Sequence, residues 1–131
     1  MKKLVLILMG VLIIGFGALP VHALMATFNP PDDPIIVNVG DSFGVEVFAQ
    51  GSFDWGDLTG FGFDVDPFGQ LSNISFNSYT IGPGFDDWGS GSFVSGVFDP
   101  FSFPPNAGQN VLLATLSFTA LSIGTDILRL I

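Results

Sequence analysis

The sequence predicts an all-β protein, a β-sandwich of about eight to nine short strands. Two observations support this prediction. Apolar and polar residues alternate with a period of two in most segments after residue 34, most clearly in residues 111–121, and this pattern is typical of a strand with one buried face. Turns rich in Gly, Pro, Asn and Asp separate these segments at spacings of about 8 to 15 residues, and no segment keeps helical periodicity.

The first 23 residues have the pattern of a secretory signal peptide. Two lysines follow Met1, residues 4–19 carry no charge, and a Val-His-Ala sequence ends at Ala23, where we expect cleavage. The apolar run is shorter than the roughly 20 residues that span a bilayer, so an uncleaved anchor is the weaker alternative. We therefore expect a secreted protein, extracellular or on the cell surface, with no membrane contact beyond the signal peptide.

Cleavage would leave a strongly acidic chain of 108 residues. Arg129 would be its single base against 12 acidic residues, which gives a formal charge of −11. A surface of this charge repels nucleic acid and anionic lipid but is compatible with neutral sugars or calcium. The chain has no cysteine, so the core rather than disulfides must stabilise the fold, and 14 phenylalanines remain to build that core.

Residues 24–34 form a lead-in to the domain, which we place at residues 35–131. The Asn-Pro-Pro-Asp-Asp-Pro sequence at residues 29–34 cannot form a central strand, because proline lacks the backbone donor. Two glycine-containing loops at residues 50–57 and 82–91 carry the tryptophans. The expected strands follow in order at residues 35–39, 43–49, 58–66, 71–76, 78–81, 92–98, 111–121 and 125–131.

The most regular strand, residues 111–121, places five apolar residues on one face: Leu112, Ala114, Leu116, Phe118 and Ala120. We expect this face to pack against a facing sheet that contains residues 43–49 and 58–66. The inward residues of those two segments would be Phe43, Val45, Val47, Phe61 and Phe63. Residues 126–131 are still strand-like where the sequence stops, so we expect either a truncated gene product or a strand that closes the sheet.

Three segments carry a family resemblance in their order along the chain. They are Val39-Gly-Asp-Ser-Phe-Gly-Val-Glu-Val47, Leu58-Thr-Gly-Phe-Gly-Phe-Asp-Val-Asp-Pro67, and Leu112-Leu-Ala-Thr-Leu-Ser-Phe-Thr-Ala-Leu121 followed by Gly124-Thr and Ile127-Leu-Arg-Leu130. Together they resemble the cohesin domain and its cohesin-like relatives in secreted bacterial proteins. Residues 77–110 depart from the family pattern.

The resemblance implies a cohesin-like jelly-roll sandwich of the superfamily that includes carbohydrate-binding modules. It also implies a non-catalytic role in attachment, to a dockerin-like partner protein or to polysaccharide, among proteins of polysaccharide catabolism. A flat strip of Gly60, Gly62, Asp64 and Asp66 could accept a protein partner, or it could be an ordinary solvent-facing surface. A structural component of an extracellular matrix or cell surface is the alternative function.

Enzymatic activity is not expected. The chain after residue 23 has no His, Cys or Lys, which excludes the Ser-His and Cys-His nucleophile systems, lysine Schiff bases and imidazole zinc sites. A glycoside hydrolase would need two carboxylates across a cleft, one of them protonated. Asp64 and Asp66 are the nearest candidates, but the sequence provides no apolar setting that would keep one protonated, so a carboxylate-based hydrolase is a distant alternative.

Two loops suggest sugar binding, because each places a tryptophan beside carboxylates. The candidates are Trp55 with Asp54, and Trp88 with Asp87. A flat ring can stack on the C–H face of a sugar while a carboxylate accepts hydrogen bonds from hydroxyls. The alternative is that both tryptophans are buried at the ends of the sandwich.

Calcium is the one ion that the sequence suggests, and we expect no other cofactor. Calcium prefers oxygen ligands, and Asp64 and Asp66 are two residues apart on one predicted strand face. Solvated carboxylates that keep the protein soluble are the alternative reading of the same pair.

Overall fold

The computed structural model describes residues 3–10, 25–29, 34–50, 59–99 and 110–131, and this part of the chain is all-β, as the sequence predicts. Among these residues no helix is long or apolar enough to cross a bilayer. The strands are β1 (Lys3–Gly10), β2 (Met25–Asn29), β3 (Ile35–Asn38), β4 (Ser42–Gln50), β5 (Gly60–Asp64), β6 (Ile74–Ile81), β7 (Phe85–Asp87), β8 (Phe93–Phe98), β9 (Asn110–Ala120) and β10 (Gly124–Leu130).

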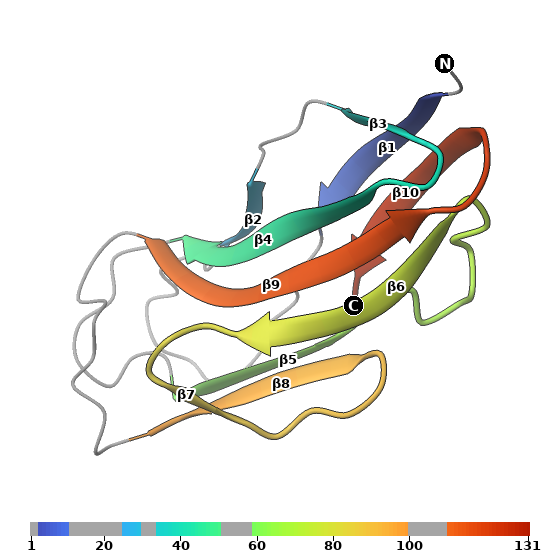
Figure 1. Cartoon of the computed structure of the whole chain (residues 1–131). Coiled ribbons are helices and arrows are strands. Elements are labelled where there is room, and N and C mark those ends of the chain that lie inside the picture. Colours follow the sequence, from blue (N-terminus) through green and yellow to red (C-terminus); the bar gives the residue numbers. More distant parts are fainter. Residues whose placement is uncertain (1–2, 11–24, 30–33, 51–58, 100–109) are drawn as a thin grey trace.

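The strands form the two layers of a β-sandwich (Figure 1). One layer is the antiparallel sheet β2-β4-β9-β6. The other joins β7-β8-β5 to β10-β1-β3, because Val65 bridges Leu130 and the backbone N–H of Asp64 donates to the carbonyl of Ile131 at 2.8 Å. All described pairings are antiparallel except that of β1 with β10.

A row of three phenylalanines runs across the first layer. Phe118 of β9 lies directly opposite Phe43 of β4 on one side and Phe76 of β6 on the other. Its ring centroid is 5.6 Å from each neighbouring ring, stacked on Phe43 and tilted against Phe76. Directly opposed aromatic pairs each stabilise a sheet by roughly 0.2–1 kcal/mol, so this row fixes the register of three strands.

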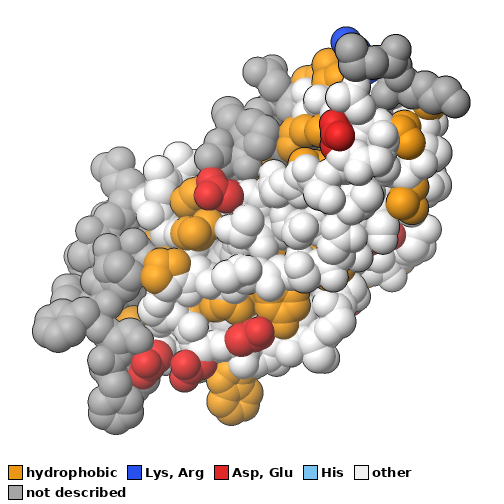
Figure 2. Space-filling model, in the orientation of Figure 1, with side chains coloured by type: hydrophobic (Ala, Val, Ile, Leu, Met, Phe, Trp, Pro, Cys, Tyr) orange, Lys and Arg blue, Asp and Glu red, His pale blue; other side chains and the backbone are white. Residues whose placement is uncertain are grey.

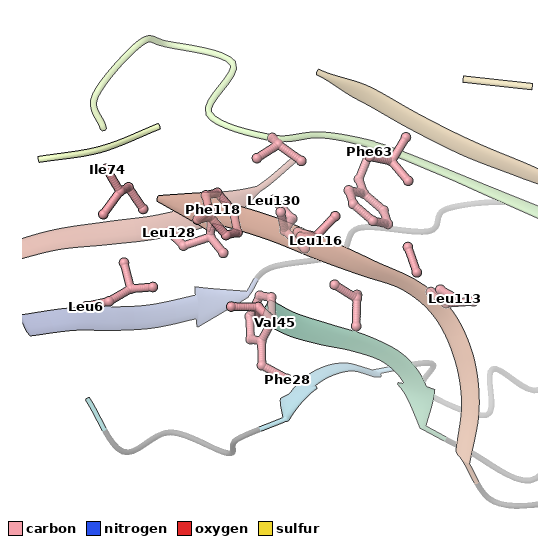
Figure 3. Packing of buried hydrophobic residues seen from close by; sticks show 14 of the residues in the cluster. Leu6, Phe28, Val45, Phe63, Ile74, Leu113, Leu116, Phe118, Leu128 and Leu130 are labelled. Carbon is pink, nitrogen blue, oxygen red and sulfur yellow. The ribbon is translucent and has the colours of Figure 1, made fainter. Parts of the chain in front are cut away.

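The core lies between the two layers and is built from aliphatic and phenylalanine side chains (Figure 3). Val45 and Leu116 come from the first layer, and Leu6, Phe63 and Leu128 come from the second. Each is at most 1% exposed. Burial of such side chains stabilises the fold by about 1.5–3 kcal/mol each, which is how a chain without cysteine can hold together.

A buried carboxylate anchors the start of β6. Asp126 of β10 is 4% exposed, and its two oxygens accept hydrogen bonds from the backbone N–H groups of Asn73 and Ile74, from Asn73 Nδ2 and from Ser72 Oγ. Four donors satisfy the buried charge, as the low dielectric of the interior requires. The turn after β9 joins the same network, because the N–H of Leu121 donates to the Asn73 carbonyl at 2.7 Å.

Two details of the predicted packing were wrong. Residues 43–49 were expected to face residues 111–121, but β4 and β9 are neighbours in one sheet, and only β5 of the expected partners lies in the opposite layer. Leu112 was expected in the core, but Leu113 is buried instead and Leu112 is half-buried. The cause is a β-bulge: Phe48 pairs with Leu112 and Val47 with Ala114, so Leu113 is an extra residue that shifts the alternation.

The structure also contains strands that the sequence analysis did not assign. The lead-in contains β2, which pairs with β4, and the second tryptophan loop contains β7, which pairs with β8. The predicted signal peptide contains β1, which lies between β10 and β3. The predicted cleavage site at Ala23 lies outside the described residues.

Candidate functional site

The outer face of the β5-β8-β7 sheet carries a cluster of exposed apolar side chains, here called the aromatic platform: Trp88, Phe93 and Val97, with Asp86 and Ser95 beside them. Trp88 is 71% exposed, Phe93 45% and Val97 40%. Side chains of alternate residues share a face, which places residues 93, 95 and 97 of β8 together. Figure 2 shows carboxylates and hydrophobic side chains gathered over β7 and β8, at the lower end of the view.

The hairpin from β7 to β8 holds Trp88 beside β8. The backbone N–H of Trp88 donates to the carbonyl of Ser95 at 2.9 Å, which continues the β7–β8 ladder by one residue. Ser90 and Phe93 exchange two backbone hydrogen bonds, and the turn between them includes Gly91 in the left-handed region with φ 61°. Trp88 and Phe93 are therefore fixed by backbone bonds at the two ends of one short turn.

Glycines make the platform flat. Gly62 of β5 pairs with Ser95, and a Cβ atom at Gly62 would lie 3.1 Å from Cζ of Phe93, so the Phe93 ring lies across the backbone of β5. Gly60 pairs with Val97 and likewise has no side chain. An aromatic ring laid over a strand glycine covers exposed backbone and presents its other face to solvent.

The polar groups divide between the two faces of β7. Asp86 pairs with Val97 and is exposed on the side of the platform, which places a carboxylate two residues from Trp88. Asp87 pairs with Gly96 and points the other way, where it accepts hydrogen bonds from Tyr79 Oη and the N–H of Gly89, both at 2.9 Å. Asp86, rather than Asp87, is thus the carboxylate on the platform.

Tyr79 of β6 reaches Asp87 from the opposite layer. Burial raises the pKa of Tyr79 above its ordinary value of 10.0, and the hydrogen bond to Asp87 and the negative charge of that carboxylate raise it further. Gly89 lies between Tyr79 and β8, because a Cβ atom there would collide with the Phe93 carbonyl and Tyr79 Oη. This contact connects the loop that holds Trp88 to the other layer.

The predicted sugar site is described only in part. Trp88 is exposed as the sugar interpretation requires, and Asp87 lies next to it in sequence but on the other face of the sheet. Trp55 and Asp54 lie outside the described residues. Asp86, Phe93 and Val97 were not chosen for the predicted site. Period-two spacing places residue 86 with 88 and residue 93 with 97, but only the register of β7 against β8 brings the two pairs together.

The two aspartates predicted for calcium do not share a strand face. β5 ends at Asp64, whose Oδ1 accepts a hydrogen bond from Ser92 Oγ at 2.7 Å. Asp66 has φ 57°, and its carboxylate accepts from the N–H groups of Gln70 and Leu71, so it anchors a turn. Within the described residues no group of three or more His, Cys, Asp or Glu side chains could hold a metal ion.

No family model, curated protein or solved structure matches this chain. The resemblance to cohesins therefore stays a prediction.

Proposed function

We propose that this chain is a non-catalytic extracellular binding module that attaches to a neutral polysaccharide through the aromatic platform. The observation that supports the proposal is the position of Trp88, 71% exposed on a flat sheet face beside Phe93 and Asp86. Exposed apolar clusters of this kind on a soluble protein mark interaction sites.

The chemistry of the platform suits a sugar. The Trp88 ring is available to stack on the C–H face of a pyranose, and Asp86 is available to accept hydrogen bonds from ring hydroxyls. The acidic surface favours a neutral glycan, since a polyanionic one would be repelled. A flat face rather than a deep pocket suits the side of an extended chain.

A protein partner is the competing occupant of the same face. The predicted strip for such a partner contained Gly60 and Gly62, but the Phe93 ring lies over Gly62, so that strip is not bare backbone. The exposed Trp88 ring and the Asp86 carboxylate beside it favour a polysaccharide over a protein partner.

The test is affinity electrophoresis through gels that contain soluble neutral polysaccharides, with the wild-type protein and Trp88→Ala. We expect one glycan to retard the wild type and the variant to bind at least about tenfold more weakly, because a tryptophan anchor contributes about 2 kcal/mol or more. Phe68→Ala is the matched control, since Phe68 is 68% exposed but belongs to the turn after β5. Retardation that survives Trp88→Ala would contradict the assignment of the platform.

Fluorescence gives a second readout. The chain has two tryptophans, so a Trp55→Phe protein reports Trp88 alone. A saturable shift of its emission with the same glycan would support stacking on Trp88. No shift with any glycan that retards the protein would contradict it.

A further inference from the structure

β1 is a central strand of its sheet. It runs parallel to β10 from Leu4 to Gly10 and antiparallel to β3 from Lys3 to Leu6. Leu4 and Leu6 point into the core and are fully buried. In Figure 1 β1 lies between β3 and β10, with β4 of the other layer in front.

Residues 4–10 of β1 belong to the apolar run of the predicted signal peptide, residues 4–19, so cleavage at Ala23 would remove this central strand. Among the described strands β3 pairs with β1 alone, so it would lose its strand neighbour. β10 would keep its bridge between Leu130 and Val65 and the hydrogen bonds that Asp126 accepts from residues 72–74. Backbone donors and acceptors of two strands would lose their partners, and the core would lose two leucines. Such a domain would have a gap one strand wide.

We propose that the exported domain carries an acceptor slot between β10 and β3 that is filled by an extended strand from a partner protein. The incoming strand would pair with β10 on one side and with β3 on the other. Backbone hydrogen bonds would supply the affinity, and the side chains at alternate positions would supply the specificity. The edges of β10 and β3 lie about two strand spacings apart, roughly 10 Å, which admits one strand.

The position of β1 defines the chemistry of the occupant. The strand runs parallel to β10, has no proline, and places two large aliphatic side chains two residues apart where Leu4 and Leu6 lie. Arg129 is exposed on β10 opposite Met9, and after export it would be the single base of the chain. A carboxylate at the position of Met9 would therefore complement the slot.

The experiment uses the full chain, produced without export and with a protease site inserted after Ala23. After cutting, native mass spectrometry should show residues 1–23 still bound to the remainder without a covalent link. A fluorescent peptide of residues 2–10 should then exchange into the slot, measured by anisotropy. Leu6→Asp in that peptide should weaken binding at least about a hundredfold, because it buries an unpaired charge.

A charge-swap control separates the slot from general apolar adhesion. A peptide with Met9→Glu should bind wild-type protein about two- to fivefold more tightly than it binds Arg129→Glu protein, the range expected for one exposed ion pair. Equal binding of the Leu6→Asp and unchanged peptides would overturn the proposal.

The exported protein supplies the remaining outcomes. Its intact mass should be that of a chain that begins at Leu24, and it should bind the same peptide. The proposal is wrong if residues 3–10 stay on the exported protein, since the slot would then be filled within the chain. It is equally wrong if cutting the full chain releases residues 1–23 with no change in melting temperature. It is also wrong if the exported protein forms a dimer that the peptide of residues 2–10 cannot dissociate.

Discussion

Tyr79 donates a hydrogen bond to Asp87 across the edge of the sandwich, with 2.9 Å between Oη and Oδ1. Tyr79 belongs to β6 in one layer and Asp87 to β7 in the other, so one side-chain pair joins the two layers. Asp87 also accepts from the N–H of Gly89, at the base of the loop that presents Trp88. The position of the platform thus depends on a polar contact as well as on the core.

The titration of Tyr79 tests this pair directly. Burial, the hydrogen bond to Asp87 and its charge raise the pKa of Tyr79, so the folded protein holds a proton that the unfolded chain releases above pH 10.0. This contribution to the free energy of unfolding is complete below that pH and is lost as pH rises through the folded-state pKa. Asp87→Asn should lower the pKa of Tyr79 toward its ordinary value. Tyrosinate absorbance measures it without ambiguity, because the chain has one tyrosine.

Asp126→Asn should destabilise the protein by about 2–4 kcal/mol, because an amide nitrogen would replace an oxygen that accepts hydrogen bonds and would face donors in a buried site. Urea unfolding measures the change. Asp86→Asn, on the exposed platform, is the matched control and should shift the free energy of unfolding by less than about 0.5 kcal/mol. Equal effects of the two substitutions would contradict the anchoring role of Asp126.

Gly89→Ala should lower stability by about 1–3 kcal/mol, because the added Cβ atom would collide with the Phe93 carbonyl and Tyr79 Oη. It should also lower the pKa of Tyr79 if the hydrogen bond to Asp87 is broken. Gly44→Ala is the control, because its Cβ would find ordinary contacts at 3.8 Å. Thermal unfolding of both variants gives the comparison, and a tolerated Gly89→Ala would show that the loop is looser than its contacts indicate.

Leu6→Ala should destabilise the full chain by about 2–5 kcal/mol, the range for a buried leucine that leaves a cavity. The exported protein made from the same variant gene should unfold with the wild-type midpoint, since cleavage would remove the substituted residue. Denaturant unfolding of the two forms side by side measures both effects. A full chain that is indifferent to Leu6→Ala would mean that β1 does not contribute to the core.

The sequence predicted best those strands whose alternation is uninterrupted. The segments that became β4, β5, β8 and β10 were all predicted within about three residues of their observed ends. β7 was missed because Phe-Asp-Asp carries little apolar signal, and its pairing with β8 comes from the hairpin rather than from composition. Alternation also cannot tell a neighbour in the same sheet from a partner in the facing one, which is why β4 was placed in the wrong layer.

The candidate site was predicted in part for a related reason. Trp88 was predicted to bind sugar from its residue type, and Asp87 was paired with it because the two are adjacent in sequence. Adjacent residues of a strand point to opposite faces, so the carboxylate that shares the platform is Asp86. Phe93 joins Trp88 only through the register of the β7–β8 hairpin, which a single sequence does not reveal.

The short length of β7 has a consequence for assembly. An exposed sheet edge can recruit further chains and grow into fibrils. Among the described strands β7 is the outer edge of its layer, and it offers three residues, two of them carboxylates. A second molecule that approached there would meet like charge and too little backbone to bind. The layer is therefore protected against open-ended growth at this margin, and the slot between β10 and β3 is closed on both sides once a single strand fills it.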